Sequence, residues 1–152
     1  VASRVFTGHS FPWQMKLAVN GTPFPIDDRR GIPKMIFKGT LEHFSEDTLA
    51  RFRRRMCGSS GQTEEFLSRT PTRTAEELRE ELAALAQGLT AYGSSSFIWD
   101  RAIIGNRDKI FPPRNQHEAW QGTEIMETEA EHYETSLFSR LLEGKGEEWT
   151  RH

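Results

Sequence analysis

Residues Phe97 to Asp108 read FIWDRAIIGNRD, an apolar run that ends at Gly105 and continues into a polar loop. Aromatic and β-branched residues are enriched in strands, whereas Gly, Asn and Asp favour turns. We therefore expect a buried strand over residues 97–104 that delivers Asp108 at its carboxyl end.

Two further runs predict strands of the same sheet. Met15 to Val19 (MKLAV) is a short apolar run before the turn dipeptide Asn20-Gly21, and Thr123 to Thr128 (TEIMET) precedes the acidic segment that carries His132. Short apolar runs bounded by turn residues are typical of strands in the interior of a protein.

Helical patterns fill the intervals. Apolar residues recur at helical spacing from Ile32 to Met56, where Ser45 and Thr48 form a partial capping box. A clearer helix is expected over Thr74 to Gln87, with Thr74 as N-cap, Glu77 as its reciprocal partner, a Leu78/Leu82/Leu85 stripe, and Gly88 as its stop.

Glycine-rich and serine-rich stretches divide the chain. GSSG at residues 58–61 interrupts the helical pattern, and GSSS at residues 93–96 reads as a linker. Shorter helices are expected at residues 115–120 and about 136–142. The order is then strand, helical block, strand, helix, strand, helix, which predicts an α/β fold with a parallel sheet and right-handed crossovers.

The long helical block between the first two strands is interpreted as an inserted cap. We expect three parts: residues 1–27 as a helix tail and core strand, residues 28–93 as a helical cap, and residues 94–152 as core strands and helices that carry the acid and the histidine.

Composition limits the classes of function. With 36% hydrophobic residues, ten Phe and four Trp, the chain is globular, and 20 basic against 22 acidic residues give no reason to expect nucleic acid as a partner. A single cysteine, Cys57, excludes an internal disulfide and fits a reducing compartment. No apolar run approaches the roughly 20 residues that span a bilayer. Without a leader sequence, a cytoplasmic location is expected.

Asp108 and His132 are the candidate catalytic residues. Alone, an Asp after a strand is most often a turn former, and a His beside Glu129 and Glu131 is most often exposed. Together, an acid and then a histidine, each just beyond a strand, match the order in which α/β-hydrolases place these two triad members after the serine. A metal site is disfavoured because no second His pairs with His132. We expect no metal and no organic cofactor.

No serine in the chain fits the nucleophile. Gly8 to Pro12 (GHSFP) resembles a G-x-S-x-G elbow but has Pro12 in place of the final Gly and lacks a preceding strand. Ser10 is therefore interpreted as a surface residue. Val1 to Phe6 reads as the tail of an amphipathic helix without a cap, which predicts that a segment upstream of it is missing from this chain.

Four arginines gather at Arg51 and Arg53 to Arg55. A solvated helix face is the usual explanation, but in a chain of net negative charge the cluster can steer an acidic partner. Arg51 and Arg55 are four residues apart and share a stripe, Arg54 flanks it, and Arg53 points away.

Several stretches together resemble one known family, the BioG-type pimeloyl-[acyl-carrier protein] methyl ester esterases. They are AVNGTPFPIDD (18–28), GIPKMIFKGTLE (31–42), FRRRMCG (52–58), NRDKIFPPRNQ (106–116) and EHY (131–133). The resemblance runs over nearly the whole chain and, as we interpret it, covers the C-terminal two-thirds of the family's length.

The resemblance implies an α/β-hydrolase fold and a serine carboxylesterase of biotin biosynthesis. It also implies that the family's N-terminal strands and nucleophile elbow lie before Val1 and are missing from this chain. It assigns Asp108 as the triad acid and His132 as the triad histidine. It implies a pimeloyl methyl ester on acyl carrier protein as substrate, with that acidic carrier bound through Arg51, Arg54 and Arg55. Two alternatives stay open: a non-catalytic module that binds acyl carrier protein, and an esterase or thioesterase for another acyl group. Another chain that covers the missing part is a further possible partner.

Overall fold

The computed structural model describes residues 2–69, 72–91, 97–144 and 146–150. Helices and strands alternate in the order expected, with a helical block between the first two strands. In chain order they are α1 (Ala2–Val5), β1 (Leu17–Val19), α2 (Lys34–Glu42), α3 (Glu46–Cys57), α4 (Ser60–Ser68), α5 (Ala75–Ala91), β2 (Arg101–Gly105), α6 (Pro113–Ala119), β3 (Glu124–Thr128), α7 (Thr135–Leu142) and the 3₁₀ helix η1 (Glu147–Trp149).

The three strands form one parallel sheet in the order β1-β2-β3, so the predicted parallel α/β organisation is confirmed. Val19 pairs with Ile103, and Ala102 pairs with Ile125. All residues of the central strand β2 are buried, as its apolar composition predicts.

Alternate residues of β2 pack into separate apolar clusters. Ile103 packs with Leu137 and Leu141 of α7, whereas Ala102 and Ile104 pack against Trp120, the residue after α6. Because successive side chains of a strand point to opposite faces, α7 and α6 cover the two faces of the sheet.

The expectation that the second strand spans residues 97–104 was wrong at its start. Strand β2 begins at Arg101, where it pairs with β1, and the preceding aromatic residues follow an irregular path. Trp99 packs edge-on against Trp120, while Ile98 is 76% exposed. Aromatic composition therefore reflected packing of this segment against the core and not strand pairing.

The residues that begin and end α3 and α4 cap these helices more completely than the sequence predicts. Ser45 and Thr48 form a complete capping box, because the Thr48 hydroxyl accepts a hydrogen bond from Ser45 N at 2.8 Å in place of the usual Glu. Gly58 ends α3 in the left-handed conformation, as a glycine C-cap should. Ser59 then caps α4, a helix that was not expected, since the GSSG stretch predicts only a break in the helical pattern.

The stop predicted at Gly88 was wrong. Helix α5 continues to Ala91, because glycine inside a helix costs only about 1 kcal/mol relative to Ala and nothing at this site forces a turn. The start was correct: Glu77 Oε2 accepts from Thr74 N at 2.7 Å, and Glu77 N donates to Thr74 Oγ1 at 3.2 Å. The expected linker at residues 93–96 lies outside the described residues.

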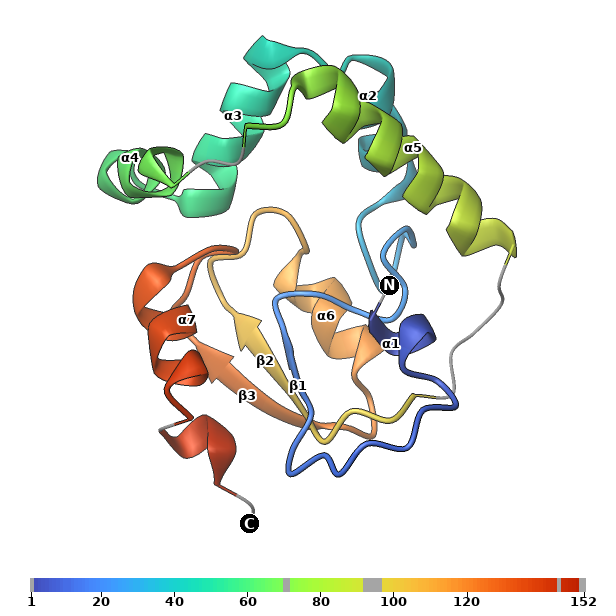
Figure 1. Ribbon diagram of the computed structural model, residues 1–152, viewed down its shortest axis with the longest axis vertical. Helices are drawn as coiled ribbons and strands as arrows, with labels where there is room; N and C mark the ends of the chain where they lie inside the picture. The colour runs from blue at the N-terminus through green and yellow to red at the C-terminus, as the bar shows by residue number, and fades with distance from the viewer. Residues whose placement is uncertain (1, 70–71, 92–96, 145, 151–152) are drawn as a thin grey trace.

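Helices α2 to α5 form a layer of their own above the sheet (Figure 1). The carboxyl ends of β2 and β3 point toward this layer, and the loops that follow them lie between the two. The boundaries at residues 27/28 and 93/94 stay predictions. Across the described ranges, no helix is long and apolar enough to cross a membrane.

A buried arginine anchors the end of the described chain to the sheet. Arg101 has a fully buried side chain that donates to the carbonyl oxygens of Glu147, Glu148 and Thr150 at 2.7–2.8 Å. Glu148, whose side chain is 7% exposed, accepts two hydrogen bonds from Arg140. These hydrogen bonds lower the pKa of Glu148 more than burial raises it.

We predict that Glu148→Gln lowers the free energy of unfolding by about 1–2 kcal/mol at neutral pH, because a charged hydrogen-bond acceptor becomes neutral. The folded-state pKa of Glu148 lies below its ordinary value, so this stabilisation exists above the ordinary carboxyl pKa and is lost as the pH falls through the lowered value. Urea unfolding at pH 7 and at stepwise lower pH should show the two proteins converging in acid.

The adjacent exposed Glu147 provides the control. Glu147→Gln should leave the unfolding curve nearly unchanged at every pH. A Glu148→Gln deficit that persists undiminished at pH 3 would contradict the assignment of the effect to the charge.

Candidate active site

Asp108 lies in the turn directly after β2. Its backbone N–H donates to Gly105 O at 3.0 Å, and its side chain is fully buried. Carboxylate oxygen Oδ1 accepts hydrogen bonds from Ile110 N at 2.7 Å and from Phe111 N at 2.9 Å. This local turn forms because a short acidic side chain can bond the backbone two and three residues ahead.

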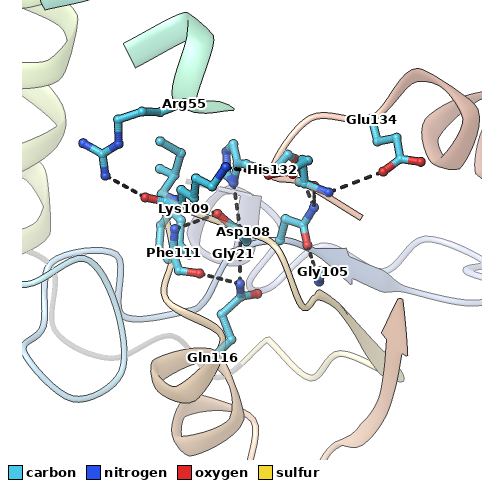
Figure 2. Close-up of polar contacts among 12 residues, drawn as sticks. Gly21, Arg55, Gly105, Asp108, Lys109, Phe111, Gln116, His132 and Glu134 are labelled. Atoms are coloured by element: carbon cyan, nitrogen blue, oxygen red, sulfur yellow. Dashed lines mark hydrogen bonds and ion pairs between the residues drawn. The ribbon is translucent and has the colours of Figure 1, made fainter. Parts of the chain in front are cut away.

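The second carboxylate oxygen, Oδ2, joins two other parts of the chain (Figure 2). Gln116 Nε2 on α6 donates to it at 3.1 Å, and His132 Nδ1 lies 3.0 Å away. The structure thus brings together the acid and the histidine that the sequence singles out, although 24 residues separate them. Their catalytic role stays a prediction.

The surroundings of Asp108 define the tautomer of His132. Oδ1 faces two backbone donors and Oδ2 faces an amide donor, so the carboxylate acts only as an acceptor and Nδ1 carries the proton. The other ring nitrogen, Nε2, has no hydrogen-bond partner within the described ranges. The ring stacks on Phe111, with centroids 6.1 Å apart and planes 13° apart.

His132 forms part of the wall of an apolar cavity of about 550 Å³. The helical layer supplies most of the wall, and the loops after β2 and β3 supply the rest. Apolar wall residues include Ile36, Phe37, Leu49, Phe52, Met56, Phe66, Leu78, Leu82, Leu85, Ile110 and Phe111. The leucine stripe expected on α5 is therefore one side of this cavity. Such a cavity with few polar groups is typical of a site for a largely apolar ligand.

The loop that carries His132 is held from above and below. Tyr133 N donates to Met56 O at the end of α3 at 3.0 Å. From the sheet side, Asn20 Nδ2 donates to the carbonyl oxygens of Glu131 and His132 at 2.9 and 3.0 Å.

Sequence reasoning missed two residues of the site. Gln116 was assigned only to a short helix, and Asn20 only to a turn. The Asn-Gly dipeptide was the available signal for Asn20, since asparagine tolerates the left-handed conformation that it adopts with φ 46°. No local pattern pointed to Gln116.

The four arginines of α3 have three different surroundings. Arg51 and Arg54 are exposed, and no ion pair joins either to another described residue. Arg55 is also exposed, but its Nη2 donates to Lys109 O at 2.7 Å, as Figure 2 shows. Arg53 is half-buried and lies at the cavity wall. Arg55 thus contacts the loop that contains the acid.

Neither Ser10 nor the single cysteine, Cys57, lines the cavity beside His132. Ser10 is exposed in the segment before β1 and is not part of the cavity wall. Cys57 is fully buried at the end of α3, and burial raises the pKa of its thiol, which disfavours the reactive thiolate. Within the described ranges, no group of three or more metal-ligating side chains gathers.

The fold and the site define a class: parallel α/β proteins in which a buried carboxylate orients a histidine at the carboxyl edge of the sheet. The chain belongs to the BioG family, described as pimeloyl-ACP methyl esterase BioG, whose family model matches residues 1–143.

Relatives agree with this assignment. The crystal structure of BioG from Haemophilus influenzae superposes with a TM-score of 0.81 at 40% identity, covering 90% of this chain and 63% of that one. An uncharacterized protein of Haemophilus influenzae is 41% identical over 141 residues, which are 91% of this chain and 64% of that protein.

A third relative carries a different activity in its name. A malonyl-[acyl-carrier protein] O-methyltransferase of Bacteroides fragilis is 47% identical over 143 residues, 93% of this chain and 29% of that protein. The chain therefore spans less than two-thirds of the length of each of these relatives.

We predict that Asp108→Asn destabilises the fold by about 2–4 kcal/mol, because the buried carboxylate accepts four hydrogen bonds and a neutral amide, which has a single oxygen, cannot accept all of them. Urea unfolding followed by circular dichroism measures the loss.

Asp28→Asn is the matched control. Its side chain is 61% exposed and also accepts a backbone hydrogen bond, from Lys34 N at 2.9 Å. This control should cost less than about 0.5 kcal/mol. Equal, small losses for both variants would contradict the described hydrogen-bond network of Asp108.

Proposed function

We propose that this chain supplies the acid and the base of a serine carboxylesterase with an α/β-hydrolase fold. One observation carries the proposal: His132 is oriented by buried Asp108 and lies at the wall of a large apolar cavity. The family description, a methyl esterase, supports the same reaction.

In this reaction His132 Nε2 accepts the proton of a serine hydroxyl as the serine attacks the ester carbonyl. His132 then donates that proton to the leaving methanol, and a water molecule repeats the cycle on the acyl-enzyme. Asp108 keeps Nδ1 protonated and stabilises the imidazolium that forms. Backbone N–H groups near the serine would bind the oxyanion.

The serine belongs, in this proposal, to polypeptide outside the 152 residues. The described cavity wall holds no serine or cysteine, and the chain matches 63% of the solved relative. The remaining part is either a further segment of the same protein or another chain.

The proposed substrate is a pimeloyl chain with a methyl ester at one end and acyl carrier protein at the other. An apolar wall suits the methylene chain of this substrate, because binding would remove the apolar surfaces of both the wall and the chain from water. Exposed Arg51 and Arg54, with Arg55, form a basic surface on α3 that suits an acidic carrier.

The name of the Bacteroides fragilis relative also includes an acyl carrier protein and a methyl group. That name describes a protein of which this chain covers 29%, so it does not assign methyl transfer to the matched part. A histidine oriented by a carboxylate favours hydrolysis for this part.

We predict that the longest natural form of the protein hydrolyses p-nitrophenyl butyrate, whereas the 152-residue chain alone does not. In the active form, His132→Ala should lower kcat by about 10³-fold or more, because the general base is lost. Spectrophotometric release of p-nitrophenol measures both rates.

His117→Ala is the matched control, since His117 is 39% exposed and pairs with Glu127 away from the cavity. Its activity should equal that of the wild type. Labelling of Ser10 by a fluorophosphonate in the 152-residue chain would show that the serine had been placed wrongly.

We predict that Arg51→Glu combined with Arg54→Glu slows turnover of a carrier-linked methyl ester by about tenfold at low salt, through a lower association rate. Hydrolysis of p-nitrophenyl butyrate should not change, because that substrate does not use the basic surface. The ratio of the two rates is compared at 20 mM and 200 mM salt, and the deficit should shrink at the higher concentration.

A double variant elsewhere matches the change in net charge. Arg29→Glu with Arg69→Glu reverses two charges whose side chains are 79% and 66% exposed. This control should keep both rates. Equal loss on both substrates in the α3 variant would mean that the arginines stabilise the helical layer instead.

A further inference from the structure

Asn20 adopts a backbone conformation that is unusual for a residue with a side chain. It follows β1 directly, has φ 46°, and is 3% exposed. Its backbone N–H donates to Ile103 O at 3.0 Å, which continues the β1–β2 pairing by one residue. Asparagine is among the few residues that tolerate this left-handed conformation at low cost.

The Asn20 amide makes three hydrogen bonds. Oδ1 accepts from Gly105 N at 2.7 Å, and Nδ2 donates to Glu131 O at 2.9 Å and to His132 O at 3.0 Å. These partners define the orientation of the amide, since its oxygen faces a donor and its nitrogen faces two acceptors.

One buried side chain therefore joins the ends of β1 and β2 to the loop after β3. The approach is close: a Cβ atom on Gly105 would lie 2.9 Å from Asn20 Oδ1 and 2.4 Å from Ala130 O. Across the described chain, Asn20 provides the side-chain hydrogen bond to the backbone of His132.

We propose that Asn20 is a positioning residue for His132. By holding two successive carbonyl groups, 131 and 132, it sets the height of the His132 backbone above the sheet, so that Nδ1 meets Asp108 Oδ2 at 3.0 Å. A displacement of about 1 Å would break that hydrogen bond and release the second tautomer. The catalytic meaning of this role rests on the proposed function of His132 as base.

Two substitutions separate the parts of this contact. Asn20→Gly keeps the backbone conformation, since glycine adopts positive φ freely, but removes all three amide hydrogen bonds. Asn20→Asp keeps an oxygen for Gly105 N and places the other oxygen against the carbonyls of Glu131 and His132, where it repels them.

The experiment records ¹⁵N–¹H spectra of the histidine rings in the ¹⁵N-labelled 152-residue chain, which need no enzymatic activity. In the wild type, His132 should show a slowly exchanging Nδ1–H signal and an unprotonated Nε2. In both Asn20 variants that Nδ1–H signal should be lost, and the two ring nitrogens should shift toward the average of the two tautomers.

Glu148→Gln is the control for a general loss of stability, because it weakens the opposite end of the sheet and should keep the His132 signal. An Nδ1–H signal that survives in either folded Asn20 variant would overturn the positioning role. So would its loss in Glu148→Gln as well, or failure of both Asn20 variants to fold, since each would mean a purely structural role.

A different result would bear on the proposed function itself. If wild-type His132 carries its proton on Nε2, that nitrogen cannot act as the base, and both proposals fail. If the wild-type signal is as expected and the folded Asn20 variants retain it as well, the proposed function stands and the role of Asn20 falls.

Discussion

The Asp108 carboxylate is the junction on which the rest of the site depends. It is buried, and a buried charge is tolerated only where hydrogen bonds replace water. Its four donors come from three segments: the loop after β2, helix α6 and the loop after β3. Each segment therefore has its position set by the same group, and the histidine is oriented as part of that arrangement.

Helix α3 of the helical layer bonds to main-chain atoms of the two loops that carry Asp108 and His132. Tyr133 N bonds to Met56 O at the end of α3, and Arg55 bonds to Lys109 O in the loop that contains the acid. Lys109 in turn lies 3.7 Å from the Glu131 carboxylate, beside the histidine. Helix α3 thus contributes to the cavity wall and also contacts both loops of the Asp108–His132 pair. A shift of α3 would therefore move the wall and the pair together.

The contacts that orient His132 do not require the proposed nucleophile to be present. The described part contains a buried carboxylate, a histidine that it orients and an apolar cavity, all held by contacts within the part itself. Under the proposed function, a nucleophile from outside these residues would meet a base that already has the correct tautomer. Preorganisation of this kind is the main way in which an enzyme lowers the barrier without reorganising at the moment of reaction.

Local patterns in the sequence determined the order of strands and helices, and they singled out Asp108 and His132, which follow strands at the carboxyl edge of the sheet. They did so because strand composition, capping boxes and turn residues act over a few neighbours. The same patterns were wrong at Gly88, where the small cost of a helical glycine did not end α5, and at the start of β2, which strand pairing decided. Only the tertiary structure assigned Gln116 and Asn20 to the site, and only it showed that Arg55 contacts the loop that contains Asp108. Asn20 reaches Glu131 across 111 residues of sequence, and Arg55 reaches Lys109 across 54. A contact of that length depends on how the sheet and the helical layer pack, and no short window of sequence contains both partners.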